Sequence, residues 1–293
     1  MASKNSLLGR LDSGEKLISD GATGTYLQSK GLEPGACPEE FNINSPSIVK
    51  GMAREYLDAG ADMVLTNSFG GNKFMLGKYG HGDRVTEFNR VAAEHASSQV
   101  KAGQYVIGSI GPTGEFLEPL GEVSEPEMFD AFAEQAVGLA QGGADAVVIE
   151  TKTALEEVSI AIKATKQNTD LVVMSTMVFD KGPRGYFTMM GITPDVGLNG
   201  MLDAGADVVG TNCGNGIDLM AELSVLMRNC TDRHLLVHSN AGIPEIKDGE
   251  IIYPETPEYM ARGFEKISAS GISILGGCCG TGPEHIRALR EVI

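Results

Sequence analysis

The sequence repeats one pattern eight times, and this repetition constrains the fold more than any other feature. Each copy begins with a short, mostly apolar run and continues with a longer stretch whose apolar residues recur every three or four positions. Apolar runs of this length are typical of strands buried on both faces, as in a parallel sheet. The eight runs span Leu17–Ala22, Met63–Ser68, Tyr105–Ile110, Ala146–Thr151, Leu171–Val178, Val208–Cys213, Leu235–Asn240 and Ile272–Cys278.

The stretches between the runs are predicted helices because their apolar residues recur with helical spacing. Three joints from a helix to the next strand have nearly the same sequence, at 58–64 (DAGADMV), 141–147 (QGGADAV) and 203–209 (DAGADVV). A glycine just past a helix end adopts the left-handed conformation that ends the helix, so each joint predicts an immediate turn into a strand. The predicted helices span Ser47–Ala59, Val85–Ala102, Glu125–Gln141, Leu155–Lys166, Pro194–Ala204, Asp218–Arg228, Pro257–Ala269 and Pro283–Val292.

Eight alternating strands and helices fit either an open, doubly wound sheet or a closed barrel. An open sheet has polar edge strands, and none of the eight runs is polar enough to be an edge. We therefore predict a single (β/α)8 TIM barrel that forms one domain over residues 1–293. In such a barrel, functional residues lie at the carboxyl ends of the strands.

Composition excludes several classes of function. The chain has 23 Lys plus Arg against 39 Asp plus Glu, and its net charge of −16 without a basic cluster disfavours nucleic-acid binding. The apolar runs are far shorter than the ~20 residues of a membrane helix. The N-terminal segment lacks the apolar core of a secretory signal. We expect a cytoplasmic protein without membrane partners, whose five cysteines stay reduced. The sequence does not indicate an oligomeric state.

The carboxyl ends of the predicted strands carry polar, titratable or glycine residues, and three of the five cysteines are among them. Cys213 ends the sixth strand, and Cys278 and Cys279 end the eighth. These strands are two positions apart in a closed barrel, so the three thiols can converge over its mouth. Three thiolates and one exchangeable ligand form a zinc site of the open, catalytic type. The alternative is that all three are free core cysteines. Cys37 and Cys230 match no ligand pattern, and we expect both to be inert.

The segment around the cysteine pair, GGCCGTGPEHIRAL at 276–289, resembles the closing motif of the homocysteine S-methyltransferase family. The segment SIGPTGEFLEPLG at 109–121 is more similar to the homocysteine-binding domain of cobalamin-dependent methionine synthase than to the betaine-dependent branch. Further matching segments cover nearly the whole chain: SDGATGTYL at 19–27, LTNSFGGN at 65–72, GSIGPTGE at 108–115, IET at 149–151 and GTNCGNG at 210–216.

The resemblance implies that zinc on Cys213, Cys278 and Cys279 binds the acceptor thiol. Coordination to a metal deprotonates a thiol whose free pKa is about 8.5. The resemblance also implies that Asp20 and Glu150 hold the ammonium group of the substrate. Further substrate-binding candidates are the backbone amides that follow the first strand and polar residues at three other strand ends: Gly21, Ala22, Thr23, Asn67, Ser109 and Asn212.

Two segments depart from the usual family pattern, at 175–194 and around His238. We expect the loop 182–191 to carry Tyr186, Met189 and Met190 over the barrel mouth. The donor is left open between a methyl-corrinoid protein, S-methylmethionine and a betaine. A quaternary ammonium group calls for aromatic rings, and only 6% of the residues are aromatic. The pattern therefore favours a separate corrinoid protein or another bulky donor. The sequence ends directly after the eighth predicted helix, so we expect no cobalamin or folate module within it.

Two other functions fit the same fold. A metal-dependent lyase or aldolase-type barrel would use Glu150 as a base, but its metal prefers oxygen and nitrogen ligands, and the strand ends offer cysteines. A non-catalytic zinc-binding barrel would need neither Asp20 nor Glu150. The favoured prediction is a zinc-dependent S-methyltransferase that acts on a thiol, with homocysteine as acceptor and methionine as product.

Overall fold

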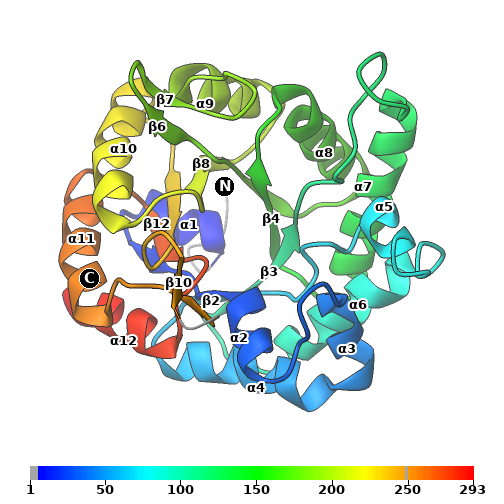
Figure 1. The fold of residues 1–293 in the computed structure, drawn as a ribbon, viewed down its shortest axis with the longest axis horizontal. Helices are drawn as coiled ribbons and strands as arrows, with labels where there is room; N and C mark the ends of the chain where they lie inside the picture. The colour runs from blue at the N-terminus through cyan, green and yellow to red at the C-terminus, as the bar shows by residue number, and fades with distance from the viewer. Residues whose placement is uncertain (1–5, 248–249) are drawn as a thin grey trace.

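The computed structural model of this protein describes residues 6–247 and 250–293. Eight parallel strands form a barrel surrounded by helices (Figure 1), so the predicted (β/α)8 TIM barrel is confirmed. The predicted domain also includes residues 1–5 and 248–249, and the predicted lack of a secretory signal rests in part on residues 1–5; both segments lie outside the described residues. The strands, in sheet order, are β1 (Leu17–Ile18), β12 (Ile274–Gly277), β9 (Leu235–Ser239), β8 (Val208–Asn212), β5 (Val172–Met177), β4 (Ala146–Lys152), β3 (Tyr105–Ile110) and β2 (Met63–Leu65).

All eight predicted helices are present. The second was predicted too long, because α6 ends at Ser97 and not at Ala102. Within the described ranges, no helix combines the length and the apolar composition needed to cross a lipid bilayer. The helices are α4 (Pro46–Asp58), α6 (Val85–Ser97), α7 (Glu125–Gln141), α8 (Leu155–Asn168), α9 (Pro194–Asp203), α10 (Ile217–Cys230), α11 (Pro257–Ala269) and α12 (Pro283–Val292).

The sequence analysis missed the short elements, because a few residues are too short a stretch to show a period. One of them, α1 (Leu7–Asp12), lies inside the ring of outer helices (Figure 1), where Leu7 and Leu11 pack into the barrel interior. The others lie in loops that follow the carboxyl ends of strands: α2 (Thr23–Ser29), η1 (Pro38–Glu40), α3 (Phe41–Asn44), α5 (Lys73–Gly77), the hairpin of β6 (Asp180–Gly182) and β7 (Gly185–Phe187), and the hairpin of β10 (Glu245–Lys247) and β11 (Glu250–Ile252).

Strand residues alternate between the barrel interior and the layer beneath the helices. Interior positions at mid-height are apolar and fully buried: Ile107, Val148, Met174 and Leu236. Two residues further along the same strands, the interior positions are polar: Ser109, Glu150, Thr176 and His238. The apolar core therefore ends in a polar layer below the mouth.

The repeated Gly-Ala-Asp joints lie at the opposite end of the barrel. Oδ2 of Asp62, Asp145 and Asp207 accepts a backbone N–H from the preceding strand at 2.8–2.9 Å. The backbone N–H of each aspartate donates to a carbonyl of that strand at 2.7–2.8 Å. β1 and β2 lie at the two ends of the sheet order, so Asp62 closes the barrel there. At the upper end of this seam, Asp20 Oδ2 accepts from the Leu65 N–H at 2.7 Å.

Candidate metal and substrate site

The three cysteines at the strand ends converge over the barrel mouth as predicted. Their sulfur atoms lie within 4.8 Å of one another, and Cys213 Sγ is 4.0 Å from Cys279 Sγ. Tetrahedral zinc with bonds of ~2.3 Å would separate two sulfurs by about 3.8 Å, so the three thiols fit a zinc ion with little movement. All three residues are partly exposed, which leaves room for a fourth ligand. In the described ranges, no other group of three His, Cys, Asp or Glu side chains is arranged to hold a metal.

The backbone around the thiols is tightly constrained. Cys213 has a φ of +61°, which is costly for a residue other than glycine and occurs mostly at functional sites. Its N–H donates to the His238 carbonyl at 3.1 Å, and the Cys278 N–H donates to the Ser239 carbonyl at 2.7 Å. A Cβ on Gly277 would lie 2.0 Å from Thr281 Oγ1, so only glycine permits this turn. These constraints fix the backbone that carries the three sulfurs.

Hydrogen bonds among the three thiols favour a thiolate on Cys213. Hydrogen bonds from the Cys278 and Cys279 thiols hold the pKa of Cys213 far below its usual value, and the side chain of Asn240 adds a further hydrogen bond. The Tyr253 hydroxyl donates a hydrogen bond to Cys279 and favours the thiolate form of that residue. A group of sulfurs that shares a thiolate at neutral pH suits a soft or borderline divalent cation such as zinc.

Two buried carboxyl groups, Asp20 and Glu150, interact with each other, and Glu150 lies beside the thiols. Glu150 accepts hydrogen bonds from Ser109 Oγ at 2.6 Å and from Asn212 Nδ2 at 3.1 Å. Burial raises the pKa of both Asp20 and Glu150 to about 7, and the nearby Glu150 carboxyl adds to the rise for Asp20. Neither forms an ion pair with any residue in the described part of the chain. Such a pair is suited to a cationic group of a ligand.

A cavity of about 460 Å³ joins these groups. Its walls include the three cysteines, Glu150, Ser109, Asn67 and the segment 21–25. No Lys or Arg of the described ranges lines it. Asp20 and Asn212 are not among its lining residues, so they lie behind the wall.

A family profile described as homocysteine S-methyltransferase matches residues 17–293. The chain belongs to this family. It is 33% identical to the methionine synthase of Mycobacterium tuberculosis and 32% identical to that of Mycobacterium leprae, over 94% of its length in each case. It spans only 24% of the length of these two relatives. The homocysteine methyltransferase MmuM of Escherichia coli, in its metallated form, has the same fold, with a TM-score of 0.80 at 19% identity over 97% of this chain and 99% of that one. The resemblance read from the motifs is therefore confirmed, and the family is one of methyltransferase enzymes.

The structure shows what other hydrogen bonds the substrate-binding candidates form. Besides its bond to Glu150, Asn212 forms two hydrogen bonds with Thr151: its Oδ1 accepts from the Thr151 N–H at 2.8 Å, and its Nδ2 donates to Thr151 Oγ1 at 2.8 Å. Asn212 therefore supports Glu150 from behind the cavity wall. Asn67 Nδ2 donates to the Pro38 carbonyl at 2.7 Å. The Ala22 N–H donates to the Thr281 carbonyl at 3.0 Å and is not available to a substrate.

The backbone amides expected to bind substrate after the first strand belong in part to the start of a helix. α2 begins at Thr23 with Ala22 as its N-cap, and Thr23, Gly24 and Thr25 line the cavity. The first N–H groups of a helix have no partners within it, so they can bind a substrate carboxylate. Gly21 lets the chain pass close to Tyr56 and Thr281, because a Cβ at this position would lie only 2.8 Å from each of them.

The expectation that the loop 182–191 places Tyr186 over the mouth is wrong. β6 and β7 form a hairpin there, and Tyr186 is only 4% exposed, with its hydroxyl donating to the Leu219 carbonyl at 3.2 Å. Met189 and Met190 are exposed. The apolar part of the cavity wall includes instead Phe69, Met75 and Tyr79, which no sequence pattern identified as site residues.

Three further buried side chains were not assigned a role from the sequence: Glu39, His238 and Lys152. Glu39 lines the cavity and accepts from the Gly70 N–H at 2.7 Å, and burial raises its pKa. The imidazole of His238 lines the same cavity; burial lowers its pKa to about 4, and its Nε2 has no partner in the described ranges. Lys152, just after Glu150, is fully buried. No spacing rule identifies such residues, because their role depends on what surrounds them.

Proposed function

We propose that this protein transfers a methyl group to the thiol of homocysteine and so forms methionine, with zinc held by Cys213, Cys278 and Cys279. The observation that carries the proposal is the shared cavity, where three clustered thiols lie beside Glu150 and no Lys or Arg of the described ranges is present. The family membership and the methionine synthases among the relatives support the same acceptor. A lyase with oxygen and nitrogen metal ligands has no such support, because the candidate ligands are sulfur.

The protein residues would bind and orient the amino acid. Glu150, held by Ser109 and Asn212, would pair with the ammonium group, which has three N–H donors, and Asp20 behind the cavity wall would add a second negative charge without contact. The first turn of α2 would bind the carboxylate. Bound zinc would lower the pKa of the substrate thiol and so supply a thiolate nucleophile at neutral pH. Fixing both ends of the amino acid would place that sulfur in line with the methyl donor.

A protein-borne donor, such as a methyl-corrinoid protein, is our first choice. Large apolar side chains are exposed in the loops that follow β3, β5 and β9, which suits a docking surface. They include Phe116, Leu120, Met189, Ile243 and Ile246. A small cationic donor, S-methylmethionine or a betaine, is the second choice, because Phe69 and Tyr79 supply aromatic faces inside the cavity. We place the reaction in the cytoplasm, where a reducing medium keeps the five free cysteines as thiols.

The test is methionine formation by the zinc-loaded protein from homocysteine, with methylated corrinoid protein, free methylcobalamin, S-methylmethionine and glycine betaine supplied one at a time. We expect turnover with at least one donor and none in a Cys278→Ala, Cys279→Ala double variant. Turnover with the corrinoid donors alone would support the docking surface, whereas robust turnover with betaine alone would reverse the ranking. Absence of methionine with every donor would refute the proposed function.

A further inference from the structure

Lys152 is a fully buried cation that the proposed chemistry does not use. Its Nζ donates to the Gly111 carbonyl at 2.9 Å and contacts Glu157 Oε1 at 3.2 Å. It also lies 4.3 Å from the centre of the Phe132 ring. A buried lysine requires such compensation, because removing an ammonium group from water is costly.

The backbone between Glu150 and Lys152 is irregular. The pairing of β4 with β5 shifts register between Ile149 and Lys152, and Thr151 has a φ of +60°. The Thr151 N–H donates to Asn212 Oδ1 at 2.8 Å, which fixes this bulge from the barrel side. The bulge directs Glu150 into the cavity and Lys152 to the opposite side, beneath α7.

Lys152 also fixes the loop that directly follows Ser109, a hydrogen-bond donor of Glu150. Glu157 Oε1 accepts from the N–H and the hydroxyl of Thr113 at 2.8 and 3.0 Å. Lys152 therefore holds Gly111 directly and Thr113 through Glu157. Both follow Ser109, whose hydroxyl donates to Glu150. One ammonium group thus ties together the two segments that position the Glu150 carboxyl.

We propose that Lys152 is a positioning residue for substrate recognition, which acts from behind the cavity wall to hold Glu150 toward the ammonium group of the amino-acid substrate. This inference rests on the proposed function. The positive charge of Lys152 also opposes the effects of burial and of the nearby Cys213 on the pKa of Glu150, because it favours the ionised form of this carboxyl. Lys152 touches no substrate itself.

The test compares homocysteine with 4-sulfanylbutanoate, the same thiol without its amino group, in the zinc-loaded wild type and in a Lys152→Met, Glu157→Gln double variant. Neutral replacement of both partners leaves no unpaired buried charge, and Gln keeps an acceptor for Thr113. We expect near-normal thermal stability, a KM for homocysteine raised about tenfold with little change in kcat, and an unchanged KM for the other thiol. Calorimetric titration of homocysteine should show the same loss of affinity.

Two further variants separate the charge of Lys152 from general effects of losing a lysine. Lys152→Gln, which removes the charge but keeps a donor for Gly111, should show the same selective effect if the double variant does not fold. Lys166→Met, which removes a lysine paired with Asp207 at the other end of the barrel, should change neither KM. Equal losses with both thiols, or a normal KM for homocysteine in the folded variants, would overturn the inference. Failure of the wild type to bind or methylate homocysteine would instead count against the proposed function.

Discussion

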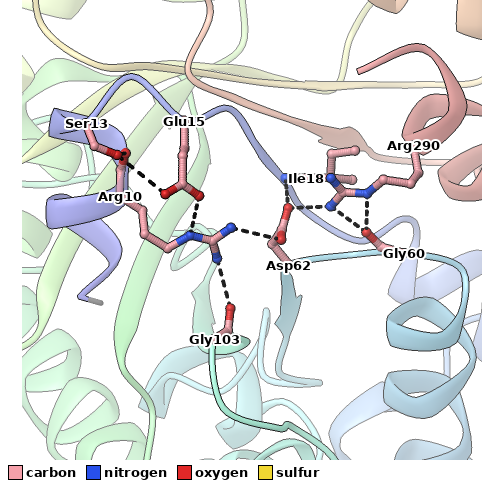
Figure 2. Close-up of polar contacts among 8 residues, drawn as sticks. All are labelled: Arg10, Ser13, Glu15, Ile18, Gly60, Asp62, Gly103 and Arg290. Carbon is pink, nitrogen blue, oxygen red and sulfur yellow. Dashed lines mark hydrogen bonds and ion pairs between the residues drawn. The ribbon is translucent and has the colours of Figure 1, made fainter. Parts of the chain in front are cut away.

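The acidic residues at the two ends of the barrel have opposite surroundings. At the amino-terminal end, Asp62 lies between two arginines (Figure 2): Oδ1 is 3.3 Å from Arg10 Nη2, and Oδ2 binds Arg290 and the Ile18 N–H. Arg10 is itself held by the Gly103 carbonyl at 2.9 Å. Every charge in this cluster has a partner, which is the arrangement expected of a purely structural site.

At the carboxyl-terminal end, Asp20 and Glu150 are more deeply buried and have no cationic partner in the described part of the chain. Their raised pKa values reflect the free-energy cost of ionising a buried carboxyl group that has no cation beside it. A protein selected for stability alone would pair or replace such groups. The barrel thus closes its amino-terminal end with its own charges, whereas the proposed function gives the acids of the other end a cation from the substrate.

The largest effect is expected from Glu150→Gln. If Glu150 pairs with the ammonium group, the variant should lose about 2–4 kcal/mol of transition-state binding, a fall of roughly 30- to 1,000-fold in kcat/KM for homocysteine. A thiol without the amino group should lose little. Equal losses with both thiols would place Glu150 in the chemistry or in folding and would break the comparison.

The second effect concerns pH. The folded protein keeps protons on Asp20 and Glu150 up to about pH 7, whereas the unfolded chain releases them near pH 4. The folded state therefore binds more protons between these values, and these two groups make stability fall as pH rises through this window, by up to about 1.4 kcal/mol per pH unit for each group. Denaturant titrations at pH 5, 6, 7 and 8 should show a flatter dependence in Asp20→Asn. An equally steep dependence in that variant would contradict the assignment.

A smaller effect is expected at the other end. Asp62→Asn should lower the free energy of unfolding by about 1–3 kcal/mol, because Arg10 and Arg290 lose their shared partner. KM for homocysteine should not change. Asp145→Asn is the matched control: Asp145 accepts the equivalent strand N–H at 2.8 Å without arginines, so its loss should stay near 0.5 kcal/mol. Equal destabilisation by the two variants would show that the arginines do not matter.

The eightfold repeat predicted the barrel. The expectation that functional residues lie at the carboxyl ends of the strands then predicted that Cys213, Cys278, Cys279 and Glu150 lie close together. These features follow from periodicity and topology, which a single sequence records. Hydrogen-bond partners are different, because they depend on loop conformation. Spacing alone could not show that Asn212 turns toward Thr151 and Glu150, that the Ala22 N–H is already bonded, or that Tyr186 is buried.

The metal content of cysteine variants tests the central claim most directly. The purified protein, measured by elemental analysis, should hold about one zinc ion per chain. Replacement of Cys213, Cys278 or Cys279 by Ala should remove that zinc, whereas Cys37→Ala and Cys230→Ala, outside the cluster, should retain it. Stoichiometric zinc in a folded Cys278→Ala, Cys279→Ala double variant would contradict the account.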